Sequence, residues 1–138
     1  MTYRIGFIST RFAGIDGVTL EAGKWAHVFE QNNHTCFWFA GELDQDKNKS
    51  FLVPEAHFKH EHNRWINNHV CGKTGRSHHV TEFIHASRSF IKERLHRFIK
   101  KFSIDLLVAE NVLTIPMHIP LGLALSEVIA ETEIPTIA

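Results

Sequence analysis

Short apolar runs and longer segments of helical periodicity follow one another along the chain. The runs lack polar alternation, which is typical of strands buried on both faces of a parallel sheet. They span residues 3–9, 34–40, 106–110 and 134–138. The first two runs flank a helical pattern, so they predict a βαβ unit and with it a parallel sheet. We expect a short further strand at residues 51–53, stopped by Pro54.

Three segments have the spacing of amphipathic helices, at residues 18–31, 81–102 and 120–132. Asp16 or Thr19 is suited to cap the first of them. Their expected packing sets are Leu20, Trp25, Val28 and Phe29; then Phe83, Ile84, Ser87, Phe90, Ile91, Leu95, Phe98, Ile99 and Phe102; and then Leu121, Leu125, Val128 and Ile129. Residues 55–76 are rich in His, Asn and Gly without a clean period, so they predict irregular structure with one helical turn near residues 64–66. The order of elements predicts a three-layer, Rossmann-like α/β domain with a mostly parallel sheet over residues 1–138.

Composition narrows the class of protein. Of 138 residues, 43% are hydrophobic and 22% are charged, which fits one globular domain and excludes a disordered chain or a coiled coil. No apolar stretch is long enough to span a membrane, and the start runs directly into a strand pattern rather than a signal peptide. The two cysteines form no disulfide framework, so we expect a cytoplasmic protein.

The formal net charge is zero, so we expect no nucleic-acid partner. Residues 71–101 nevertheless hold eight Lys and Arg against two Glu, whereas residues 105–138 hold five acidic residues and no Lys or Arg. This pattern favours a solvated basic helix beside an acidic one. The basic and aromatic helix at residues 81–102 also resembles an interfacial membrane helix, so peripheral membrane contact stays an alternative to packing on the sheet.

Candidate binding residues follow two of the predicted strands. Gly14 and Gly17 follow the first strand and allow the backbone to approach a ligand, and the next helix offers free N–H groups from its start. Glu110 and Asn111 follow the strand at 106–110, where a carboxylate and an amide can bind hydroxyl groups. Ligands of open α/β sheets bind at this edge. An ordinary βα loop and a capped turn before Pro116 are the alternatives.

Three further patterns do not complete a known motif. Gly72-Lys73-Thr74 ends like a phosphate-binding loop, but Asn67 stands where the first glycine belongs. His60-Glu61 begins like a metalloprotease helix, but Arg64 replaces the second histidine. His57, His60 and His62 have no cysteine partner at zinc spacing. We therefore expect neither a metal nor a cofactor.

Three segments together resemble the group 1, family-four-like retaining glycosyltransferases of the GT-B fold. These are Arg4-Ile5-Gly6-Phe7-Ile8-Ser9 with Gly14-Ile15-Asp16-Gly17-Val18-Thr19-Leu20-Glu21, then residues 102–111, and then residues 121–137. The resemblance covers both ends of the chain. It implies one half of a GT-B fold, the N-terminal acceptor-side domain of a hexosyltransferase. The implied partners are a nucleotide-sugar donor and a sugar or lipid acceptor.

The resemblance also implies site residues. It places Gly14, Asp16, Gly17 and Val18 beside the donor phosphates and the acceptor, and Glu110 and Asn111 in the cleft, and it assigns no catalytic residue. Asp16 stands where many relatives have glycine, and Glu110-Asn111 replaces a histidine-containing pair. Because the chain stops within a strand pattern, we expect a longer protein and no transfer by these residues alone. The alternative is a non-catalytic Rossmann-like ligand-binding or regulatory domain.

Overall fold

Five strands form a single sheet in the computed structural model, which describes residues 1–138. The strands lie in the order β3-β2-β1-β4-β5, and every neighbouring pair is parallel. Their bounds are Arg4–Ile8 for β1, Thr35–Ala40 for β2, Ser50–Leu52 for β3, Leu106–Ala109 for β4 and Thr136–Ile137 for β5. The predicted α/β class, the parallel pairing and the short third strand are confirmed.

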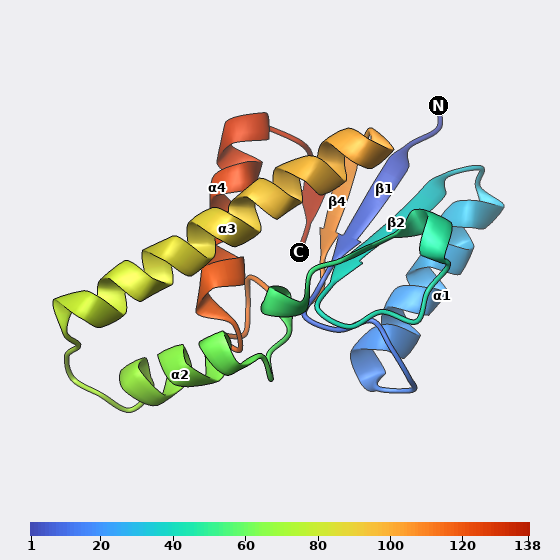
Figure 1. The fold of residues 1–138 in the computed structure, drawn as a ribbon. Coiled ribbons are helices and arrows are strands. Elements are labelled where there is room, and N and C mark those ends of the chain that lie inside the picture. The colour runs from blue at the N-terminus through green and yellow to red at the C-terminus, as the bar shows by residue number, and fades with distance from the viewer.

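Helices cover both faces of this sheet, which gives the three layers of a Rossmann-like fold (Figure 1). One face carries α1 (Gly17–Gln31), and the other carries α3 (His78–Phe102) and α4 (Ile119–Thr132). A further helix, α2 (Glu61–Val70), lies beside the first half of α3 and away from the sheet. Short 3-10 helices, η1 (Lys47–Lys49) and η2 (Pro54–Ala56), flank β3.

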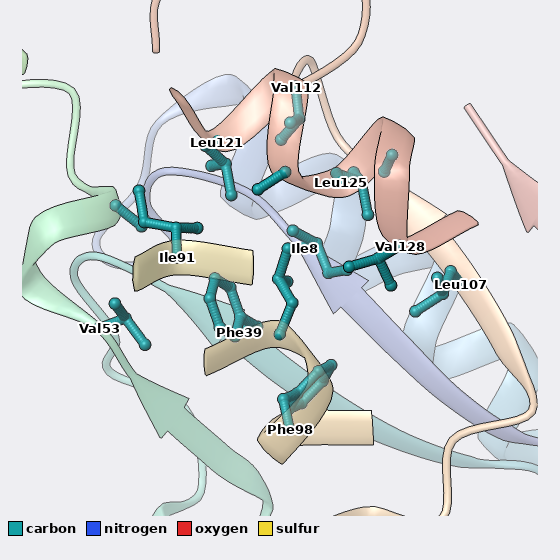
Figure 2. Close-up of a cluster of buried hydrophobic side chains, with 14 of the residues drawn as sticks. Ile8, Phe39, Val53, Ile91, Phe98, Leu107, Val112, Leu121, Leu125 and Val128 are labelled. Atoms are coloured by element: carbon teal, nitrogen blue, oxygen red, sulfur yellow. The ribbon is translucent and has the colours of Figure 1, made fainter. Parts of the chain in front are cut away.

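The larger core lies between the sheet and the pair α3 and α4 (Figure 2). Ile8, Phe39 and Leu107 reach it from three strands, where they meet Phe98 of α3 and Leu125 of α4. Unbroken apolar strands and a helical stripe therefore meet as the periodicity predicts. The stripe of α3 is shifted slightly, since Val80 is buried whereas Phe90 is exposed.

The packing face expected for α1 is wrong except at Phe29, which is half-buried against the core on this side of the sheet. Leu20, Trp25 and Val28 are exposed, and the helix instead buries Thr19, Ala22 and Ala26. The strands beneath carry large aromatic side chains, including a stacked pair of Phe7 and Trp38, and Phe12 of the loop after β1 packs beside them. Close packing against such a surface leaves room for small residues only, so alanine faces the sheet in α1.

The interpretation of residues 55–76 as irregular is also wrong, since α2 runs from Glu61 to Val70. Only Asn63 and Ile66 of this helix are buried, and its apolar face is limited to Trp65, Ile66 and Val70 among His and Asn residues. Its start is also unusual, because the side chain of His60 accepts a hydrogen bond from His62 N–H in place of a typical Ser, Thr, Asp or Asn cap.

Ion pairs join the basic helix α3 to the acidic helix α4, so the two oppositely charged segments of the sequence lie side by side. Lys92 Nζ lies 2.7 Å from Glu131 and 3.4 Å from Glu127, and Arg88 lies 3.2 Å from Glu127. The hydrogen bond from Lys92 lowers the pKa of Glu131, and it raises the pKa of Lys92. No helix here is both long enough and apolar enough to cross a membrane.

Two phenylalanines on α3 test this placement of the core. We expect Phe98→Ala to lower the free energy of unfolding by about 3–5 kcal/mol, because the ring is fully buried, with 0% of it exposed. Phe90 is 36% exposed, so Phe90→Ala should lower the free energy of unfolding by about 1 kcal/mol or less. Urea unfolding followed by circular dichroism measures both. Equal losses would contradict the described face of α3.

Candidate functional site

A polar cavity opens at the carboxyl edge of the sheet, beside the point where the strand order changes direction. The chain goes from β1 to β2 on one side, and β4 later pairs with the other side of β1. Ligands of doubly wound sheets bind at such a switch point. The cavity has a volume of about 720 Å³. Its walls are Ser9, Thr10, Arg11, Asp16, Gly17, Val18, Glu42, His57, Phe58, Lys59, Asn111 and Met117.

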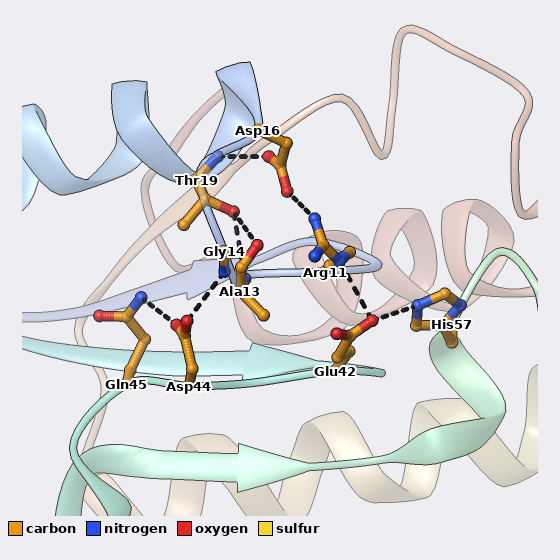
Figure 3. A network of polar contacts seen from close by, with 9 residues as sticks. All are labelled: Arg11, Ala13, Gly14, Asp16, Thr19, Glu42, Asp44, Gln45 and His57. Carbon is orange, nitrogen blue, oxygen red and sulfur yellow. Dashed lines mark hydrogen bonds and ion pairs between the residues drawn. The ribbon is translucent and has the colours of Figure 1, made fainter.

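The loop between β1 and α1 is held in place by Asp16 and Thr19 (Figure 3). Asp16 caps α1, because its carboxylate accepts a 2.8 Å hydrogen bond from Thr19 N–H. The hydroxyl of Thr19 in turn lies 3.1 Å from Ala13 N and 3.3 Å from Ala13 O. The predicted cap is thus confirmed, and the loop folds back onto the start of the helix.

Arg11 joins this loop to the segment after β2 (Figure 3). Its guanidinium pairs with Asp16 through one nitrogen, and its Nε donates to Glu42 Oε1 at 3.1 Å. The same Glu42 oxygen lies 2.9 Å from His57 Nε2. Because His57 Nδ1 accepts a hydrogen bond from Lys59 N–H, the proton on the ring belongs to Nε2, which donates it to Glu42.

Both carboxylates of this network are ionised at neutral pH. Partial desolvation raises the pKa of Asp16, but the hydrogen bond from Thr19 N–H and the charge of Arg11 outweigh it and lower the pKa overall. The hydrogen bond from His57, with help from Arg11, lowers the pKa of Glu42. Their stabilising contribution is therefore lost only as the pH falls below about 4.

The charges of the cavity balance. Arg11 and Lys59 are cationic, Asp16 and Glu42 are anionic, and His57 donates a hydrogen bond to Glu42. Such a wall offers acceptors and donors to hydroxyl groups without a net field that would attract an anion. Phe58, stacked on His57 at 4.7 Å between ring centroids, adds a flat apolar surface.

Four of the six predicted binding residues meet in this cavity: Asp16, Gly17, Val18 and Asn111. Gly14 and Glu110 do not line it. Asn111 has a φ of +63°, so it turns sharply away from β4. Gly14 has a φ of +74° and its N–H donates to Asp44 at 2.8 Å, which makes it a residue of the loop conformation.

Two details differ from the sequence-based expectation. Gly17 is the first residue of α1, and its φ is not positive. A β-carbon there would meet nothing within 4 Å, so neither backbone strain nor crowding requires glycine at this position. Glu110 borders a pocket of only about 10 Å³. Burial, with the nearby Glu21, raises the pKa of Glu110.

The sequence interpretation missed Arg11, Glu42 and Lys59 and considered His57 only as a metal ligand. A usable signal was the position of Glu42, which lies two residues after β2, near the sheet edge that Glu110 marks directly after β4. Gly41 was a second signal, because a β-carbon on it would collide with the backbone nitrogen of His57. Glycine at this position therefore allows η2 and His57 to approach the end of β2.

No three side chains of His, Cys, Asp or Glu converge in a way that could hold a metal ion. No protein-family model matches the chain, and neither a curated protein nor a solved structure is significantly similar to it.

His118 follows Met117 of the cavity wall and caps the start of α4. Its Nδ1 accepts a 3.1 Å hydrogen bond from Leu121 N–H, and its Nε2 donates to the carbonyl of Glu55 at 2.7 Å. A second proton on the ring would sit on Nδ1, where it would face the N–H of Leu121 and replace an acceptor with a donor. Burial is the main cause that lowers the pKa of His118 to about 4.

This histidine predicts a loss of stability in mild acid. Between pH 6.5 and about 4, the unfolded chain protonates His118 whereas the folded chain does not, so the free energy of unfolding falls by about 3 kcal/mol as the pH drops. Asn at this position keeps a capping acceptor without a titratable group. We therefore expect His118→Asn to remove this part of the slope.

Urea unfolding at several pH values between 6.5 and 4 measures the effect. The matched control is His27→Asn, since His27 is exposed on α1 and should leave the slope unchanged. An identical slope in the wild type and in His118→Asn would contradict the assignment.

Proposed function

We propose that this chain is the N-terminal, acceptor-side domain of a GT-B glycosyltransferase, and that its polar cavity binds a hydroxyl-rich acceptor. One observation carries the proposal: a cavity of about 720 Å³ lies at the switch point of a doubly wound sheet, with paired carboxylates and cations in its walls. Carboxylates, amides and guanidinium groups are the donors and acceptors that sugar hydroxyls require. The resemblance of residues 4–9, 14–21, 102–111 and 121–137 to the family adds the reaction class.

The balanced charge of the cavity supports an acceptor more than a diphosphate. Asp16 already occupies the start of α1, and Arg11 is paired with both Asp16 and Glu42. Gly17 and Val18 offer the first backbone N–H groups of the helix, which are suited to one anionic oxygen. A nucleotide-sugar donor then requires further cationic groups from a second domain across the cleft.

Substitutions of two glycines on α1 test the acceptor site. A valine at Gly17 would add a side chain to the cavity lining, whereas Gly23 lies six residues further along α1 and lines no part of this cavity. A β-carbon meets nothing within 4 Å at either position. We expect simple sugars to bind the wild type with millimolar affinity. Gly17→Val should bind at least about tenfold more weakly, and Gly23→Val should bind as the wild type does.

Nuclear magnetic resonance titration with a panel of monosaccharides and disaccharides measures this binding, with shifts expected at Gly17, Asn111 and Lys59. Equal weakening by both substitutions would indicate a general effect on α1. Shifts confined to other surfaces would refute the cavity as the acceptor site.

We expect no glycosyl transfer and no nucleotide-sugar hydrolysis by the 138-residue chain alone. Transfer requires a leaving diphosphate stabilised by positioned charges and an acceptor held against the sugar, and on this proposal the chain supplies only the acceptor side. The measurement is product formation with a panel of nucleotide-sugars. Turnover by the chain alone would mean that it holds a complete active site, against the two-domain cleft.

A second candidate function is a non-catalytic ligand-binding domain. It is favoured by the engagement of the histidine and both carboxylates of the cavity: both ring nitrogens of His57 are hydrogen-bonded, and Asp16 and Glu42 are paired with Arg11. Sugar binding without transferase activity in the complete gene product would select this alternative.

A further inference from the structure

Lys59 differs from the other lysine, arginine, aspartate and glutamate side chains in the wall of the polar cavity, because it has no oppositely charged partner. Arg11 pairs with both Asp16 and Glu42. Lys59 also lines the cavity but forms no ion pair, and its Nζ lies 5.6 Å from the centroid of the Phe58 ring, another part of the wall. The wall is therefore neutral as a whole but uneven: three linked charges that are negative overall, and one free cation.

The negative part of the wall keeps one free acceptor (Figure 3). Both hydrogen bonds to the carboxylate of Glu42, from Arg11 Nε at 3.1 Å and from His57 Nε2 at 2.9 Å, reach Oε1. No group of the protein donates to Glu42 Oε2, and this side chain is half-exposed. A carboxylate oxygen accepts but cannot donate, so a ligand hydroxyl at Oε2 must donate its proton.

His57 connects the free acceptor to the free cation. Its Nε2 donates to Glu42, and its Nδ1 accepts a 2.9 Å hydrogen bond from the backbone N–H of Lys59. The ring of Phe58 stacks on His57 at 4.7 Å between centroids, and Lys59 Nζ lies near the same Phe58 ring. Glu42 and Lys59 thus border one pair of stacked rings, whose flat surface can pack against the C–H groups of a ligand.

These groups restrict the chemistry of a matching ligand. Hydroxyl groups satisfy Glu42 Oε2, and an anionic group satisfies the ammonium of Lys59. A phosphomonoester carries close to two negative charges at neutral pH, whereas only one cation of the wall is free. A single carboxylate therefore matches this wall better than a phosphate does.

We infer that the ligand of the polar cavity is a sugar with one carboxylate, a hexuronic acid, whose carboxylate lies at Lys59 and whose hydroxyl donates to Glu42 Oε2. This inference rests on the proposed acceptor site and narrows the class of its ligand. The wall as a whole has no net field that attracts anions, so the preference for the carboxylate comes from the local contact with Lys59.

Glucose and glucuronate are matched probes, because they differ only in the exocyclic group, a hydroxymethyl in one and a carboxylate in the other. Galactose and galacturonate form a second pair with a different arrangement of hydroxyl groups. We expect at least one uronate to bind about twofold to fivefold more tightly than its neutral counterpart at low ionic strength, the factor that one accessible ion pair provides. Added salt should remove this gain. Nuclear magnetic resonance titration measures all four affinities.

A matched pair of lysine variants locates the contact. Lys59→Gln removes the charge and keeps most of the side chain, so it should bring the affinity ratio of uronate to neutral sugar to about 1. Lys24 is exposed on α1 and does not line the polar cavity, so Lys24→Gln should keep the wild-type ratio.

The outcomes separate this inference from the function on which it rests. Equal affinities within both sugar pairs, or a uronate preference that survives in Lys59→Gln, would overturn the carboxylate assignment and leave the acceptor site standing. Absence of binding by all four sugars would refute the acceptor site itself, and the carboxylate assignment with it.

Discussion

The backbone pairing of β1 on both edges is the constraint on which the rest of the structure depends. Ile5 to Ile8 pair with residues of β2 on one side and of β4 on the other, so this short strand is buried on both edges and both faces. Every backbone group in such a strand must find its partner in the sheet. The ladder continues past the strand, since Ser9 N–H donates to the carbonyl of Phe39 and Glu110 N–H donates to that of Ile8. The segments that follow β1, β2 and β4 are thereby brought to the same edge of the sheet.

Arg11 then converts this proximity of loops into a defined site. It belongs to the loop after β1 and holds Asp16 at the start of α1 and Glu42 after β2, while Glu42 also accepts from His57. All four side chains lie near the surface, so the individual ion pairs add little to stability. Their contribution is to orientation: the polar groups in the cavity wall are already fixed before any ligand binds, which lowers the entropic cost of binding.

The sheet and α3 were predictable from the sequence because their burial leaves a direct pattern in it: unbroken apolar strands and a stripe on a long helix. The face of α1 was not, since the size of its buried residues is set by Phe7 and Trp38 on distant strands. The predicted site residues follow β1 and β4, and in a parallel sheet the ends of these strands are expected at one edge from the order of elements alone. Glu42 was missed because it meets Arg11 only where the loop after β1 pairs with the segment after β2. His57 was missed because it meets Glu42 only through the close approach of η2 to Gly41, and no local pattern records either contact.

The histidine-rich segment supports the polar cavity from behind, although α2 contributes no residue to it. Asn63 of α2 bridges the carbonyls of Phe58 and Met117, two residues of the cavity wall that lie far apart in the sequence. His118, next to Met117, caps α4 and binds the carbonyl of Glu55 before Phe58. Two buried side chains thus tie the segment after β3 to the segment after β4. Asn63 and His118 both act by donating hydrogen bonds to backbone carbonyls, and neither side chain lines the polar cavity. The shape of the polar cavity therefore depends on side chains outside its wall.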